Sequence, residues 1–161
     1  MDQDSIRRYI ADTFDGVDIL IPTDGIAAGD TFFYYDPERN LDPKGKWPFA
    51  TIVTKDYGEF DCASNLNRTG VFRLNIGVSP DTYRSLFGPQ PSARDAAGVV
   101  DSGHDFTALD QLLPHPVYAP QSWVCVLNPS PETLQILRPL VAEAYHLAVR
   151  RLTRGRPAEE S

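Results

Sequence analysis

Hydrophobic positions along the chain follow two different spacings, and each spacing predicts a kind of secondary structure. Ile6, Ile10 and Phe14 recur every fourth residue, which predicts an amphipathic helix over residues 4–14. In the segment GVFRLNIGV, residues 70–78, apolar and polar side chains alternate. Alternation has the period of a strand with one buried face, so this segment is the clearest strand of the chain.

Other segments add strands and helices in an order that indicates the fold class. Short segments rich in β-branched or aromatic residues predict strands at 17–21, 31–35, 49–54 and 122–128. Capping and proline signals predict a short helix over 80–87, a helical turn within 105–113, and a long helix from 130 to about 152 that Pro139 should kink or split. Because strands and helices do not alternate regularly, we expect an α+β fold: an antiparallel sheet of about five strands with helices packed on one face.

Length and composition fit one domain. A chain of 161 residues with 42% hydrophobic and 23% charged residues has ordinary globular composition. We expect a single domain over residues 1–152, followed by a disordered polar tail over 153–161, with the sequence TRGRPAEES from 153 onward.

Charge and the character of the N-terminus restrict partners and location. The formal charge of −7 repels a phosphate backbone, so nucleic acid is an unlikely partner, although arginines near both ends leave weak binding as an alternative. The chain lacks an apolar run of about 20 residues and its start does not resemble a signal peptide, which predicts no membrane partner and a cytoplasmic location. Two cysteines without a paired motif fit reduced thiols.

Several motifs carry a resemblance to known families. The C-terminal third, from LLPHPVYAPQSWVCVLN onward, resembles the end of MmcQ/YjbR-like domains, in which a strand bearing a tryptophan precedes a long helix that closes the sheet. With PFATIVT, SNLNRTGVFRLNIGV and DFTALDQLLPHPVYA, residues 1–150 resemble an uncharacterised family of short actinomycete proteins, a domain of unknown function. The resemblance implies a YjbR-like fold and no activity. The DNA binding discussed for YjbR-like proteins conflicts with the acidic charge of this chain.

A first candidate site consists of loop histidines. His104, Asp105 and His115 lie close in sequence to Tyr118 and Trp123. Histidine and carboxylate groups can relay a proton, so these three are candidate catalytic residues. Their spacing fits no zinc motif, and histidines beside prolines commonly have structural roles, so we expect no metal.

A second candidate site is a polar cluster leading into the clearest strand. Arg73 and Asn75 project from its polar face, and the residues before it are Asp61, Ser64, Asn65, Asn67 and Arg68. Arg73 must therefore either meet solvent or face a cleft with a partner. An arginine and two asparagines can hold a carboxylate or phosphate. The alternative is a solvated sheet face whose asparagines serve turns.

A third candidate site is the concentration of aromatic residues in the first half of the chain. It consists of the segment TFFYY, residues 31–35, with Trp47, Phe49, Tyr57, Phe60 and Phe72. Alternation prevents four rings from pointing to one side of a strand. The outward rings therefore line a pocket for a planar apolar molecule, pack in a core, or meet a second subunit.

We therefore expect a domain that binds a small molecule or a protein partner in a polar and aromatic cleft, through Asn67, Arg68, Arg73, Asn75, Tyr118 and Trp123. This requires the arginine and histidine clusters to meet in space. Alternatives are a small-molecule enzyme with a loop histidine as general base, and a homodimer joined at the edge of the TFFYY strand. No nucleotide-binding or common hydrolase motif occurs, and we expect no cofactor.

Overall fold

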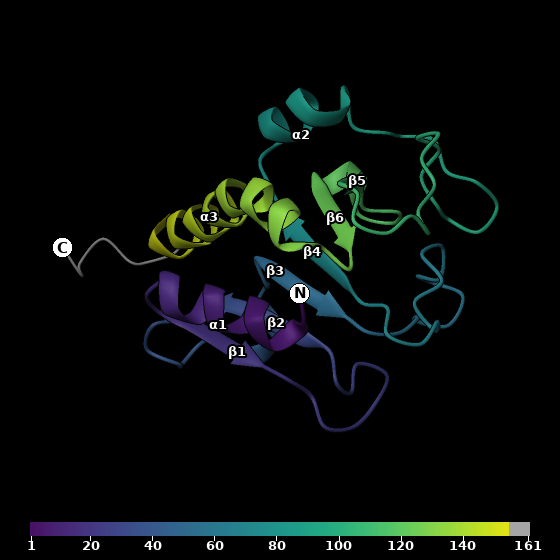
Figure 1. Cartoon of the computed structure of the whole chain (residues 1–161). Coiled ribbons are helices and arrows are strands. Elements are labelled where there is room, and N and C mark those ends of the chain that lie inside the picture. The colour runs from purple at the N-terminus through teal and green to yellow at the C-terminus, as the bar shows by residue number, and fades with distance from the viewer. Residues whose placement is uncertain (155–161) are drawn as a thin grey trace.

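The computed structural model describes residues 1–154 and has an α+β architecture (Figure 1). Its helices are α1 (Gln3–Thr13), α2 (Pro80–Phe87) and α3 (Pro131–Arg154). Its strands are β1 (Val17–Leu20), β2 (Thr31–Tyr35), β3 (Ala50–Val53), β4 (Arg73–Gly77), β5 (Leu113–Pro114) and β6 (Trp123–Leu127). Two 3₁₀ turns, Pro43–Gly45 and Ala119–Gln121, lie in the connections.

The six strands form one antiparallel sheet in the order β1-β2-β3-β4-β6-β5. Neighbours in sequence pair as far as β4, and β6 then pairs with β4 from the C-terminal part of the chain. Figure 1 shows α1 and α3 side by side across one face of the sheet. Within residues 1–154 the opposite face carries no α-helix, and this asymmetry leaves room for a site.

Each strand divides its side chains between the two faces. Phe33 is fully buried in the core beneath the helices, whereas its neighbour Phe32 points to the opposite face. The strand register places Phe32 beside Thr51, Thr51 beside Asn75, and Asn75 beside Cys125. A row of side chains from four strands thus crosses the helix-free face.

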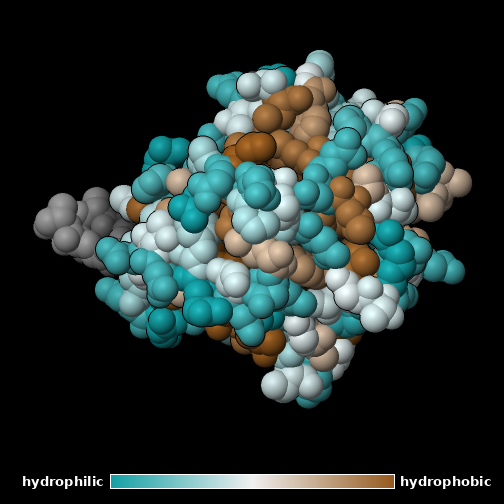
Figure 2. All heavy atoms as spheres, viewed as in Figure 1, coloured by the Kyte–Doolittle hydropathy of each residue, from teal (hydrophilic) through white to brown (hydrophobic). Residues whose placement is uncertain are grey.

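The helix side contains the main hydrophobic core. Ile6 and Ile10 of α1 meet Leu134, Leu137 and other residues of α3 over the sheet. Figure 2 shows this side of the molecule mostly coated by hydrophilic and neutral residues, with smaller hydrophobic groups between them. The core is therefore covered where the helices meet solvent.

Pro139 does not split α3, which is continuous from Pro131 to Arg154. A proline removes the hydrogen bond to the carbonyl four residues earlier. That carbonyl belongs to Gln135, and both Gln135 and Pro139 are exposed, so water can satisfy it. Of the two outcomes expected at Pro139, a kink or a split, the split does not occur. Thr153 and Arg154, assigned from sequence to the tail, are helical. The rest of that predicted tail, 155–161, lies outside the described residues.

The sheet differs from the expected one in strand number and burial. Leu113, expected to end a helical turn, begins β5 with Pro114, which an edge strand tolerates because one side needs no ladder hydrogen bonds. Strand β4 is buried on both faces, since Arg73 and Asn75 are nearly inaccessible. The TFFYY strand, β2, pairs with β1 and β3, so it offers no free edge for a dimer.

No helix of residues 1–154 is long and apolar enough to cross a membrane.

Candidate functional site

A cavity of about 480 Å³ opens on the helix-free face of the sheet. Strands β2, β3, β4 and β6 form its floor, and the loops after β2, β3 and β5 form its walls. Aromatic side chains line much of it: Phe32, Tyr34, Trp47, Tyr57, Phe60, Tyr118 and Trp123. Polar residues line it as well: Lys44, Lys46, Thr51, Asp61, Asn75, His115 and Gln121. A cavity lined by aromatic rings together with some polar groups is typical of small-molecule sites.

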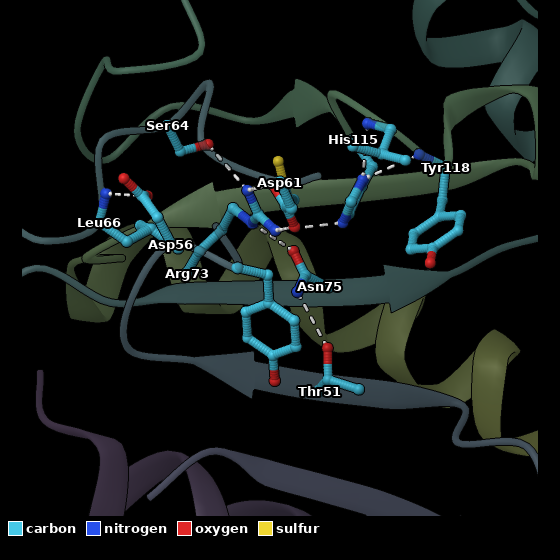
Figure 3. A network of polar contacts seen from close by, with 12 residues as sticks. Thr51, Asp56, Asp61, Ser64, Leu66, Arg73, Asn75, His115 and Tyr118 are labelled. Carbon is cyan, nitrogen blue, oxygen red and sulfur yellow. Dashed lines mark hydrogen bonds and ion pairs between the residues drawn. The ribbon is translucent and has the colours of Figure 1, made fainter. Parts of the chain in front are cut away.

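Of these polar residues, Thr51, Asp61, Asn75 and His115 belong to a buried network centred on Arg73 (Figure 3). Arg73 Nη1 and Nη2 donate to the two carboxylate oxygens of Asp61, at 3.1 and 2.5 Å. Nη1 also donates to Ser64 Oγ at 2.9 Å, and Nε donates to Asn75 Oδ1 at 2.8 Å. Asn75 Nδ2 in turn donates a hydrogen bond to Thr51 Oγ1 at 2.9 Å.

This network holds a charged pair beneath the aromatic walls. Arg73 has no exposed surface, and the side chain of Asp61 is 10% exposed. Burial opposes the guanidinium charge, but the hydrogen bond and charge of Asp61 outweigh it and raise the pKa of Arg73. Bidentate geometry fixes the orientation of both groups, so the cavity floor is rigid.

His115 follows β5 and reaches the same network. Its Nδ1 accepts hydrogen bonds from the backbone N–H groups of Val117 at 3.0 Å and Tyr118 at 2.9 Å. Two donors at Nδ1 require a lone pair there, so the neutral ring carries its proton on Nε2; this tautomer is assigned from the hydrogen bonds. Burial and the nearby Arg73 charge lower the pKa of His115 well below 6.5.

The depressed pKa of His115 predicts acid sensitivity. In the unfolded chain the ring takes a proton near pH 6.5, whereas the folded protein resists it. Stability from this group is therefore fully present above pH 6.5 and is lost as pH falls toward the folded pKa, with a slope approaching about 1.4 kcal/mol per pH unit. Urea unfolding between pH 7.5 and 5 should show this slope in the wild type and in His146→Asn, which changes an exposed histidine, but not in His115→Asn. Equal slopes in all three proteins would contradict it.

A second buried carboxylate fixes one cavity wall. Asp30, with no exposed surface, accepts hydrogen bonds from the backbone N–H and side-chain hydroxyl of Thr54, from Lys55 Nζ, and from the Tyr57 hydroxyl. Burial, and after it the bond to Asp30, raises the pKa of Tyr57. Tyr57 N–H donates to Asp61 O at 2.9 Å, so the wall and the floor belong to one assembly.

The opposite wall carries a tethered cation. Lys46 Nζ lies 2.8 Å from carboxylate oxygens of both Asp18 and Asp36, and 4.6 Å from the ring centre of Tyr34. Burial disfavours the ammonium group, but its bonds to Asp18 and Asp36 prevail and raise the pKa of Lys46. The ion pairs of Lys46 therefore fix the position of this wall. The adjacent loop places Trp47, which is 73% exposed, at the mouth of the cavity.

Comparison with known proteins assigns the chain to a family. A family described as "Family of unknown function (DUF6194)" matches residues 1–157, nearly the whole chain. The chain belongs to the DUF6194 family. No curated protein and no solved structure matches it. The expectation of a domain of unknown function is thereby confirmed.

In this DUF6194 chain the arginine and histidine clusters meet in part. Arg73 Nη2 lies 3.3 Å from His115 Nε2, and Asn75, Tyr118 and Trp123 line the cavity beside them. His104 is separate: it is exposed, contacts Ser102 Oγ and packs edge-on against Phe87 of α2.

The other predicted site residues have local contacts elsewhere. Asp105 accepts from the N–H and hydroxyl of Thr107. Asn67 accepts from the Asp56 N–H, and Arg68 donates to three backbone carbonyls. Asn67 and Arg68 line a separate, open hollow near the N-terminus, which Arg7 and Lys55 share. Asn67 and Arg68 are therefore not at the cavity.

Sequence reasoning singled out aromatic residues that line the cavity, Tyr57 and Phe60 among them, but missed the cavity-lining Lys44, Thr51 and Gln121. Thr51 was detectable from its position: it alternates with apolar neighbours in a β-branched strand and pairs with Asn75. The loop residues carried no comparable signal. Among residues 1–154, no three His, Cys, Asp or Glu side chains gather as a metal site requires.

Proposed function

We propose that this protein binds a small molecule with a planar, largely apolar body in the cavity on the helix-free sheet face. One observation carries the proposal: seven aromatic side chains from several separate segments surround a cavity of about 480 Å³ above a polar floor. Aromatic rings at such a site contact a flat ligand by stacking and edge-to-face packing.

The exposure of the rim supports a ligand site over a filled core. Trp47, Phe60 and Tyr118 are 73%, 57% and 41% exposed, although they stand around one opening. Phe60 and Tyr118 are in edge contact, with ring centres 6.1 Å apart. Large aromatic side chains gain more from covering a bound molecule than from facing water.

The rigid floor supports selective binding. The Arg73–Asp61 pair and the Asn75–Thr51 bond are fixed by buried hydrogen bonds, so little ordering is needed when a ligand arrives. A general-base role for His115 has weaker support, because its Nδ1 lone pair already accepts two backbone bonds. We therefore favour binding over proton abstraction.

The fluorescent probe 8-anilino-1-naphthalenesulfonate tests this function. We expect one saturable site whose probe emission is displaced by unlabelled naphthalene compounds. Trp47→Ala and Phe60→Ala should each weaken binding about threefold to tenfold, because each removes an aromatic contact. Ile136→Ala is the matched control, since Ile136 is 64% exposed on α3 away from the cavity. Equal binding by all four proteins would contradict the proposed site.

A further inference from the structure

Two hydrogen-bond donors face each other at the cavity: His115, which lines it, and Arg73, which lies beneath its floor with no exposed surface. His115 Nε2 bears a proton because Nδ1 accepts from two backbone N–H groups. The polar atom recorded beside Nε2 is Arg73 Nη2, at 3.3 Å, and a guanidinium nitrogen can only donate. This contact therefore supplies neither group with an acceptor.

A count of the N–H donors of Arg73 also identifies the contact with His115 as the one that lacks an acceptor. A guanidinium has five N–H groups. In the described residues, four of them have acceptors: Nε with Asn75, Nη1 with Asp61 and Ser64, and one N–H of Nη2 with Asp61. The remaining N–H of Nη2 is the one on the side of His115. Figure 3 shows the imidazole and guanidinium groups directed toward one another.

The other neutral tautomer of His115, with its proton on Nδ1, also leaves donors without an acceptor. A proton on Nδ1 would let Nε2 accept from Arg73, but it would then face two backbone donors at 2.9 and 3.0 Å. Those two donors would lose their acceptor within a buried turn, and an unsatisfied buried donor is costly. The Nε2–H form leaves fewer conflicts within the protein.

We propose that the ligand of this cavity presents an oxygen acceptor, a carbonyl or carboxylate, to the Nε2–H of His115, the donor that Arg73 cannot satisfy. This inference rests on the proposed function and names the chemistry of its ligand. His115 lines the cavity, whereas Arg73 has no exposed surface and does not line it, so of the two donors His115 is the one that a bound molecule can reach.

The charges around the cavity floor indicate the chemical class of the ligand more narrowly. Arg73 and Asp61 neutralise each other, and Lys46 is paired with Asp18 and Asp36. An uncharged carbonyl therefore enters without upsetting the balance at the floor, whereas a carboxylate adds a charge beside Asp61. The preferred ligand is a planar aromatic compound with a carbonyl group.

Three naphthalene probes of similar size test the acceptor: 2-acetylnaphthalene, 2-naphthoate and 2-ethylnaphthalene, which lacks an oxygen. Both tryptophans of the chain line the cavity, so quenching of their fluorescence reports directly on the site. We expect 2-acetylnaphthalene to bind about tenfold more tightly than 2-ethylnaphthalene, the effect of one satisfied buried donor. Stronger binding of 2-naphthoate than of 2-acetylnaphthalene would retain the acceptor and overturn the preference for an uncharged one.

Two substitutions separate the ligand contact from the structural contact of His115. Asn at position 115 keeps an acceptor where Nδ1 lies but has no donor at the place of Nε2, whereas Gln offers an amide donor near Nε2 and lacks the Nδ1 acceptor. His115→Asn should abolish the preference for 2-acetylnaphthalene with a small loss of stability. His115→Gln should retain much of the preference and lose more stability. The opposite pattern would overturn the inference.

Failure of the inference is distinguishable from failure of the proposed function. Equal affinity for 2-acetylnaphthalene and 2-ethylnaphthalene would overturn the acceptor and leave the binding cavity intact. Absence of saturable quenching by all three probes would overturn the cavity as an aromatic site, and the acceptor with it. Long-range ¹H–¹⁵N NMR of the histidine rings gives a test without ligand: the Nε2–H tautomer is expected for His115, and a Nδ1–H tautomer would overturn the inference.

Discussion

Asp61→Asn should lower the free energy of unfolding by about 3–5 kcal/mol, because it removes the charge that compensates a fully buried guanidinium. The Asn side chain can still accept from Arg73, but it leaves the positive charge in a region with little access to water. Urea denaturation monitored by tryptophan fluorescence measures the loss, and an unchanged m-value would show that the folded state remains compact.

An exposed pair of the same kind is the control. Arg84 and Asp81 form an ion pair on α2 whose side chains are 49% and 91% exposed. Asp81→Asn should change stability by less than about 0.5 kcal/mol, since surface pairs contribute little. A double variant, Arg73→Met with Asp61→Leu, should cost less than the sum of the two single changes. Similar losses for Asp61→Asn and Asp81→Asn would show that the Arg73 network does not hold the fold.

Phe33→Ala and Phe32→Ala should affect different properties, stability and ligand binding, although the residues are adjacent. Phe33 is fully buried against the helices, with its ring centre 6.4 Å from that of Phe49, so its truncation should cost about 3–5 kcal/mol. Phe32 lines the cavity and is partly exposed, so its truncation should cost about 1 kcal/mol and weaken binding of the naphthalene probes.

Thermal unfolding and probe titration together check this pair. Phe33→Ala, at a temperature where it is folded, should bind the probes as the wild type does, because it lies on the other face of the sheet. A loss of binding in Phe33→Ala without a loss in Phe32→Ala would contradict the assignment of faces.

Much of the fold could be predicted because local patterns dictate it. The helical spacing of Ile6 and Ile10 and the strand TFFYY agree closely with α1 and β2. Residues 80–87, with a Ser79 cap and a proline at the first position, form α2 as expected. Strand β5 was missed because two residues carry no period, and only pairing with β6 makes them a strand.

The site depends on contacts that local patterns do not encode. Arg73 occupies the polar face of an alternating strand, which fits either solvent or a cleft with a partner, and the contacts with Asp61 and Ser64 of the preceding loop decide for burial. Whether His104 or His115 meets Arg73 depends on the pairing of β5 with β6, and no spacing reveals it. From sequence, the meeting of the arginine and histidine clusters therefore had to be assumed. Of the two histidines, His115 lies beside Arg73 and His104 does not.

The strand order also implies when the cavity forms during folding. Strands β1 to β4 join by successive antiparallel neighbours, and such pairings close short loops. Strand β6 joins β4 only after residues 78–122 have been brought round, a slower step because it closes a long loop. We expect Arg73 to meet Asp61 within the first half of the chain, and His115 to arrive last. A ligand held between His115 and the aromatic residues of the first half would then favour the docking of the C-terminal part, and so help to complete the protein that binds it.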